Sequence, residues 1–436
     1  MRFSLTALMT AVSLTFCLPG VAQTVEWHDP RAVAEVAVAN SPALLRIAAD
    51  VRAARERVSQ ADSWPNPMVM GGVQNLPVDF GTEEMTMYMV GISQSIPRGS
   101  RRNAMRAAAE AELRRVELEA ESVSAEVRRD ALFAWYEVAG ADSRITTLRK
   151  VAAALDAVTE AARARYESGT TMQVDVVRAQ FQRSEVQHQI LGETGRRRTA
   201  ASRLLPLLGL PLTTEVPVLE MGHGAERASI DEPREIPESH PAIAALKADV
   251  ERRELELGIA ELQTRPDIDI EASYGLRPSH TDMVSLVARV ELPFRKRTLI
   301  EPRVREAAAM RDAAEQRIDE LKRTLLADLG AAWEAHDLAT RQIAFHEQVL
   351  VPQSQLTVES TRAAYEAGGT TLDAVLSVEA SWLRLEIEYF DFLVAHIQAV
   401  VDFEAIRDGA RTGRIGGGGS VSMSDGSATA TPAGMR

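Results

Sequence analysis

Five methionines between residues 68 and 89 are the clearest candidate metal ligands in the chain. Their thioether sulfurs are soft ligands that suit Cu(I) or Ag(I). The same residues alternate along the sequence, and methionine also fills space on one face of a strand. Two interpretations therefore stay open, contact with a soft metal ion and simple packing. The five are Met68, Met70, Met85, Met87 and Met89.

The residues that usually carry out catalysis show no such grouping. The eight histidines are scattered, no two form a helical pair at ligand spacing, and H-E-x-x-H is absent. The P-loop, G-x-G-x-x-G and G-x-S-x-G motifs are absent too. The formal net charge of −13 argues against nucleic acid as a partner. We therefore expect no enzyme and no cofactor.

The first 22 residues read as a signal peptide, with Arg2 as its positive end and an apolar stretch from Phe3 to Leu18. We expect the mature chain to begin at Gln23. The only cysteine, Cys17, lies inside this segment, and the large Phe16 before it disfavours acylation. The mature chain would then form no disulfide. No later segment is apolar for long enough to predict a transmembrane helix.

The elements that must position any functional residue are dominated by one very long helix, predicted from Arg98 to Tyr166. This stretch contains no proline, and after Gly99 at its start the only glycine is Gly140. Apolar residues recur in alternating steps of three and four, as in the seam of a coiled coil. Such a helix is about 100 Å long. The seam residues are Leu113, Val116, Ala120, Val123 and Val127, then Ala131, Ala134, Val138, Ala141, Ile145, Leu148, Ala152 and Leu155.

The chain is internally duplicated with a period of roughly 199 residues, which indicates one structural unit built twice. Asn40-Ser41-Pro42 recurs as Ser239-His240-Pro241, and Ala134-Trp135 recurs as Ala332-Trp333. The Gly/Thr turns from Tyr166 to Thr171 and from Tyr365 to Thr371 also correspond.

Each unit is predicted to contain a first helix, a β-hairpin, the long helix, a tight turn and a return helix. We expect repeats at 23–216 and 237–408, a linker or equatorial loop at 217–236 and a disordered Gly/Ser-rich tail at 409–436. In the second repeat Pro352 should bend the long helix. The predicted first helices run from Asp29 to Ser63 and from Pro237 to Thr264, and the return helices from Gln173 to Leu208 and from Leu372 to Asp408.

The hairpins show the two-residue period of outer-membrane strands, with one apolar and one polar face. The period is clear from Ile268 to Leu276, from Val284 to Leu292 and from Tyr88 to Ile96, and weaker from Pro67 to Val73. Four strands cannot close a barrel around a channel, and open edges are not tolerated in lipid. Three copies would supply twelve strands. A hairpin packed on a soluble core is the alternative.

These features resemble the TolC family of outer-membrane efflux channels, most of all its heavy-metal, CzcC- and CusC-like branch. The resemblance covers nearly all of Gln23 to Asp408. It rests on the duplicated order of elements, on Ser93-Gln94-Ser95-Ile96-Pro97 leading into Arg98, and on Tyr-x-x-Gly at Tyr166 and Tyr365. The return helices add Asp175 to Gln180 and Val375 to Ala380. Each motif is weak alone, but their repetition in register is specific.

The resemblance implies a mainly helical protein with a small β part. Three chains form a homotrimer, with a twelve-stranded β-barrel in the outer membrane and a long α-helical tunnel in the periplasm. The helical tips dock a periplasmic adaptor (membrane fusion protein), which connects to an inner-membrane RND pump. The channel exports heavy-metal ions or small toxic compounds. The open alternatives are a type I protein-secretion channel and a soluble periplasmic coiled-coil scaffold.

The resemblance also suggests site residues. Asp175, Tyr365 and Asp373 would form a periplasmic gate, although Ala374 replaces an expected Asp and the ion-pair latch is in doubt. The alternative is that both aspartates stabilise a helix N-terminus through its dipole. The tips that would dock the adaptor, where glycine permits the chain to reverse, consist of Gly169, Thr170, Thr171, Gly368, Gly369 and Thr370.

Overall fold

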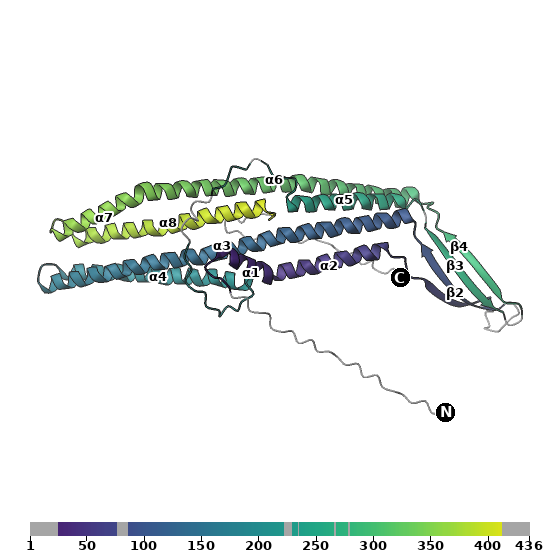
Figure 1. Cartoon of the computed structure of the whole chain (residues 1–436), viewed down its shortest axis with the longest axis horizontal. Helices are drawn as coiled ribbons and strands as arrows, with labels where there is room; N and C mark the ends of the chain where they lie inside the picture. Colours follow the sequence, from purple (N-terminus) through teal and green to yellow (C-terminus); the bar gives the residue numbers. More distant parts are fainter. Residues whose placement is uncertain are drawn as a thin grey trace, which may run out of the picture.

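The computed structural model shows a long helical rod with one sheet at its end (Figure 1). It describes residues 25–75, 86–221, 229–233, 235–265, 267–277 and 280–411. The predicted signal peptide, Met85, part of the linker and residues 412–436 of the predicted tail lie outside these ranges. The elements are α1 (Pro30–Asn40), α2 (Pro42–Asp62), β1 (Met68–Gln74), β2 (Met87–Ile96), α3 (Gly99–Glu167), α4 (Gln173–Leu207), α5 (Pro241–Leu262), β3 (Ile268–Leu276), β4 (Met283–Val290), η2 (Lys296–Ile300), α6 (Glu301–Phe345), η3 (His346–Leu350), α7 (Val351–Glu366) and α8 (Leu372–Arg407).

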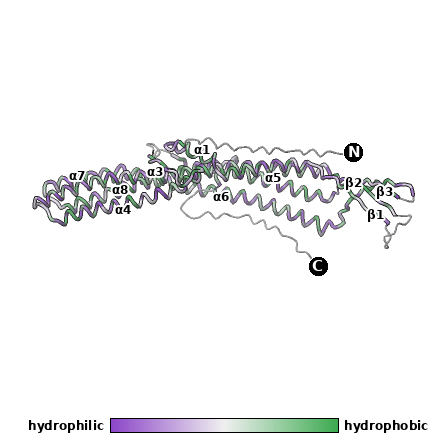
Figure 2. The backbone as a smooth tube through the Cα atoms, turned by 90° about the horizontal axis from the view of Figure 1, so that it is seen from below, coloured by the Kyte–Doolittle hydropathy of each residue, from purple (hydrophilic) through white to green (hydrophobic). Residues whose placement is uncertain are grey.

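The predicted long helix is confirmed as α3, which has 69 residues. Its seam is buried from Ala131 to Leu155, apart from Ala152. Towards the sheet Val116 of the predicted seam is buried, while Leu113, Ala120, Val123 and Val127 are half-buried. There α3 packs against both α2 and α5, so the buried positions spread around the helix. They include Ala111, Ser122 and Ala125. Figure 2 shows hydrophilic and hydrophobic residues interspersed along the whole rod.

The single first helix predicted from Asp29 to Ser63 is wrong, because the structure has two helices, α1 and α2. Pro42 cannot donate a backbone hydrogen bond and keeps Ser41 extended, with φ −65° and ψ 120°. The Ser41 hydroxyl then accepts a bond from the Leu44 N–H. In the second repeat α5 begins at Pro241 rather than at Pro237.

The bend predicted at Pro352 is confirmed. A π-helical turn, η3, separates α6 from α7 directly before this proline. The N–H of Val351 bonds to the carbonyl of His346, five residues back. The extra residue in this turn accommodates the proline, and the two helices curve there (Figure 1).

One cluster of buried apolar residues lies about halfway along the rod, where α1, α3 and α4 meet (Figure 1). Trp135 is 1% exposed, and its indole N–H donates to the carbonyl of Trp27 at 2.7 Å. The beginning of the predicted linker is fastened here, since the Leu219 N–H donates to the Asp142 carboxylate at 3.0 Å. The start of the predicted tail is also packed. Ala410 is fully buried, and the Arg411 N–H donates to Glu126.

The two hairpins join through β2 and β3 into one antiparallel sheet of order β1-β2-β3-β4. Val90 pairs with Tyr274, and Tyr274 pairs with Val284, so their side chains share one face. β1 and β4 are the two edges of this sheet.

Among the described residues, no single helix is long and apolar enough to cross a membrane. The bent pair of α1 and α2, which meet at 47°, passes that test by length and composition only.

Candidate gate, docking tips and sheet faces

The hairpin turns of the two repeats lie at the end of the rod farthest from the sheet (Figure 1). In the first, Gly169 has φ +73°, and Gly169 and Thr170 donate to the carbonyls of Tyr166 and Arg165. In the second, Gly368 has φ +77° and makes the matching bond to Tyr365. This is the Schellman ending of a helix, which needs a left-handed residue. A Cβ at Gly169 or Gly368 would meet no atom within 4 Å, whereas one at Gly369 would lie 3.4 Å from the Ala364 carbonyl oxygen.

The threonines of the turns bond within their own hairpins. The Thr170 hydroxyl donates to the Arg165 carbonyl at 2.9 Å. The Thr371 hydroxyl caps α8 by accepting from the Ala374 N–H at 3.3 Å. Gly369 is exposed and Thr370 is half-buried. The predicted docking residues are therefore preorganised and accessible at the tip.

Besides the apolar cluster in which Ala162 and Ala179 pack with Leu372, two contacts of charged groups connect the tips of the two repeats. The guanidinium of Arg165 on α3 lies over the Tyr365 ring of α7, 4.5 Å from its centroid. Arg178 on α4 pairs with Asp373 on α8 at 3.2 Å. Two of the three predicted gate residues thus lie where the repeats meet. Their arginine partners were not predicted.

Asp175 lies in a different environment. It occupies the first turn of α4 and accepts a hydrogen bond from the Thr171 hydroxyl of its own hairpin. In the part of the chain that the structure describes, no hydrogen bond or ion pair joins Asp175 to Tyr365 or Asp373. The position in the first turn fits the alternative role of stabilising a helix N-terminus.

Farther up the rod, a buried cation holds both return helices to α3. Arg144 donates to Glu193 of α4 at 2.9 Å and to Asp391 of α8 at 3.0 Å. Glu193 is 7% exposed and also pairs with Arg196 at 2.7 Å. Charge-assisted bonds of this kind fix the relative positions of the helices they join.

One face of the sheet is apolar and exposed across all four strands. Val284 is 78% exposed and Leu286 77%. The opposite face carries Glu271, which pairs with Arg289 of the neighbouring strand. An apolar outer face beside a polar inner face is the pattern of a strand in an outer-membrane barrel. The exposed apolar face comprises Val69, Val73, Tyr88, Val90, Ile92, Ile268, Ile270, Tyr274, Leu276, Val284, Leu286 and Val290.

The described methionines of the predicted cluster lie on the opposite, polar face. Met70 pairs with Gly91, and Met89 pairs with both Gly72 and Gly275, which places these side chains on one face. Met68 and Met87 share this face by the same register, and so does Met283, which was not predicted. A Cβ at Gly275 would overlap the sulfur of Met87, so Met87 fills space above that glycine. Among the described residues, no group of three or more His, Asp or Glu could hold a metal ion.

Comparisons with known proteins agree with this geometry. The sequence matches the family described as outer membrane efflux protein twice, over residues 33–210 and 233–406. A search of curated proteins gives no match.

Several solved structures share the fold. CusC has a TM-score of 0.74 at 15% identity, covering 87% of this chain and 92% of that one. A membrane protein from Pseudomonas aeruginosa has a TM-score of 0.74 at 20% identity, covering 88% and 92%. The outer membrane protein VceC of Vibrio cholerae has 0.71 at 18%, covering 87% and 96%. The match over both repeats shows that the chain belongs to the outer membrane efflux protein family, whose TolC-like fold it shares.

Proposed function

We propose that three copies of this chain form the outer-membrane channel of a tripartite efflux system. The observation that carries the proposal is the sheet. Its apolar face is exposed, and β1 and β4 are edges with unpaired backbone groups. Unpaired edges are not tolerated in lipid, and four strands cannot close around a channel. Pairing β4 of each copy with β1 of the next gives a closed barrel of twelve strands.

The helices support the same assembly. On α4, Val174, Val177 and Phe181 are exposed at the spacing of one helix face, and Phe181 is 65% exposed. On α7 no residue is buried, and Leu356 is 68% exposed. Apolar stripes of this kind indicate contact with another helix. In a trimer the rods would lie beside each other and continue the barrel as a tunnel.

The partners follow from the exposed tips. The glycine turns at Gly169 and Gly368 leave a low profile where the hairpin of a periplasmic adaptor can pack. The adaptor would connect the channel to an inner-membrane RND pump. In this role the chain binds no cofactor and carries out no catalysis, because its work is to provide a water-filled path and a gate.

The gate of the proposed channel lies at the same tips. Arg165 and Arg178 hold Tyr365 and Asp373 against the first repeat, and these contacts would keep the tunnel closed. Asp175 contributes to the constriction by its charge at the N-terminus of α4. Opening requires the two hairpins of each chain to separate, which breaks both contacts.

The proposed cargo is heavy-metal ions or small toxic compounds, moved from the periplasm to the outside. The thioethers of Met70 and Met89 on the polar face would offer soft contacts to Cu(I) or Ag(I) near the exit. A strain lacking the gene should become sensitive to such metals, and the wild-type gene should restore resistance. Resistance unchanged for metals but lost for organic compounds would refute the metal cargo.

Reconstitution tests the channel itself. The purified protein should run as a heat-dissociable trimer, fractionate with the outer membrane and conduct ions in a planar lipid bilayer. A water-soluble monomer without conductance would contradict the proposal and would favour a periplasmic scaffold.

A further inference from the structure

The segment that joins β4 to α6, residues 291–299, combines exposed apolar and cationic side chains. Phe294 is 87% exposed, Leu292 58% and Leu299 47%. Arg295, Lys296 and Arg297 follow one another and are also exposed. The segment enters α6 through a π-helical turn, η2, which departs from the regular helix. We call residues 291–299 the junction segment.

The cations of the junction segment are not used inside the chain. Among the described residues, no carboxylate lies within 4.0 Å of the charged groups of Arg295, Lys296 or Arg297. In the first repeat Arg101, the counterpart of Arg297, pairs with Asp267 at 2.7 Å, and the neighbouring Arg102 pairs with Asp62 at 3.8 Å. In a chain of net charge −13, three adjacent unpaired cations indicate an anionic partner.

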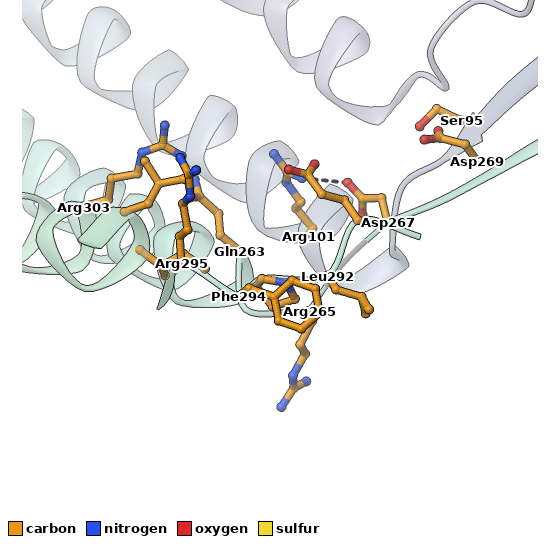
Figure 3. Close-up of a pocket in the computed structure, with 14 residues that line it drawn as sticks. Ser95, Arg101, Gln263, Arg265, Asp267, Asp269, Leu292, Phe294, Arg295 and Arg303 are labelled. Carbon is orange, nitrogen blue, oxygen red and sulfur yellow. Dashed lines mark hydrogen bonds and ion pairs between the residues drawn. The ribbon is translucent and has the colours of Figure 1, made fainter. Parts of the chain in front are cut away.

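A cavity of about 680 Å³ lies beside the junction segment, between the sheet and the helices (Figure 3). Arg295 and Arg303 line it, while Arg101 and Asp267 pair with each other at its other side. Arg303 bonds to the amide of Gln263 at 3.0 Å and has no carboxylate partner among the described residues. Of the three adjacent cations only Arg295 lines the cavity, where Arg303 and Arg265 lie with it beside the carboxylates of Asp269 and Glu291.

The position of the segment identifies the partner, and this step rests on the proposed function. The ten residues of β2 extend over about 33 Å, or about 23 Å along the membrane normal at a 45° tilt. That height matches the apolar band of about 25 Å of an outer-membrane barrel. The end of β4 at Val290 then lies at the edge of the band, and the junction segment lies at the level of the lipid headgroups.

We propose that the junction segment binds the phosphate groups of anionic phospholipids in the periplasm-facing leaflet of the membrane. Arg295, Lys296 and Arg297 contact the phosphates, and Arg does so with a planar, two-pronged donor. Leu292 and Phe294 enter the boundary of the acyl chains, where apolar and aromatic residues are favoured. Free phosphate would satisfy the cations but would leave both apolar side chains exposed to water, so the phospholipid is the occupant that fits.

The test uses the full-length mature protein in detergent and compares binding of spin-labelled phosphatidylglycerol with that of spin-labelled phosphatidylcholine. One variant combines Arg295→Gln, Lys296→Gln and Arg297→Gln. Each cation near an anionic lipid surface contributes about a fivefold preference, so the triple variant should lose up to about a hundredfold in its preference for phosphatidylglycerol. A variant with lysine at positions 295 and 297 keeps the charge and should keep most of the preference.

The matched control combines Arg317→Gln and Arg323→Gln, two exposed cations on α6 far from the junction segment. It should bind phosphatidylglycerol as the wild type does, and salt should weaken binding in both. An unchanged preference in the triple variant would overturn the proposal.

Two further outcomes identify other occupants and would also overturn the proposal. Displacement of the labelled lipid by millimolar inorganic phosphate would indicate a free-anion site. Dissociation of triple-variant trimers in lipid-free detergent, with lipid preference unchanged, would assign the segment to a neighbouring copy. The proposed function is tested separately by conductance in phosphatidylcholine bilayers, where wild type and triple variant should both insert and conduct. Failure of the wild type to insert would refute the channel as well.

Discussion

Removing the two contacts between the tips should open the channel. The perturbation is the double variant Arg165→Gln and Arg178→Gln, which leaves Tyr365 and Asp373 in place but deprives them of their cationic partners. Both arginines lie on the first repeat, and both partners lie on the second. The variant therefore acts on the relation between the hairpins and leaves each hairpin's own packing intact.

The magnitude follows from the exposure of these groups. Arg178 and Asp373 are 50% and 65% exposed, so solvent screening reduces their pairing to about 0.5 kcal/mol. The cation over the Tyr365 ring contributes about 0.5–1 kcal/mol at an exposed site. Each chain then loses about 1–1.5 kcal/mol. If three chains open together, the closed state loses about 3–4.5 kcal/mol, which raises the ratio of open to closed channels about 150- to 2000-fold.

The assay is single-channel recording in planar bilayers at low voltage, with the fraction of time spent in the open state as the readout. The control is Arg163→Gln with Arg183→Gln, because these arginines pair with Glu167 and Asp156 inside the first hairpin. The control removes the same charge from the same tip and should stay closed like the wild type. Equal open fractions in the double variant and the wild type would refute the gate. Equal opening by both variants would show that only net charge matters.

The remaining predictions concern stability, measured as the temperature at which the trimer dissociates. Burial lowers the pKa of His336, whose ring stacks on His396 with centroids 4.6 Å apart. The folded state therefore favours the neutral ring, so stability should fall as pH drops below about 6.5, and His336→Phe should weaken that dependence. An alanine in place of Gly368 should cost about 1 kcal/mol because its φ of +77° disfavours a side chain, whereas an alanine at Gly330, in mid-helix with open space around it, should not destabilise. Arg144→Met leaves the buried Glu193 with only an exposed partner and should cost about 3 kcal/mol, while the exposed Arg46→Met should change stability little.

The sequence predicted the elements whose signals are local. The apolar period gave α3 within one residue at each end, and the repetition of Gly/Thr turns located both tips. Pro352 marked the bend between α6 and α7. The same kind of signal is present at Ser41-Pro42, where a capping residue before a proline indicates the boundary between α1 and α2.

The rest depends on contacts between residues distant in the sequence. Arg165 and Arg178 carry no motif that distinguishes them from the other exposed arginines, and only folding brings them to partners about 200 residues away. Pairing of β2 with β3 is likewise nonlocal, since each hairpin was predicted separately. The partial burial of seam residues near the sheet, such as Val123, also depends on distant contacts, because α2 and α5 both pack on α3 there.

Cross-linking between the sheet edges tests the central claim of a shared barrel most directly. Cys17 is the only cysteine and lies in the predicted signal peptide, so introduced cysteines can be paired without interference. Each variant carries one cysteine at Gly71 of β1 and a second at one of the positions 284–290 of β4. Oxidation in intact outer membranes should convert at least one such pair into covalent trimers and no larger species. An absence of cross-links at every position, or a ladder extending beyond three chains, would contradict a barrel built from three copies.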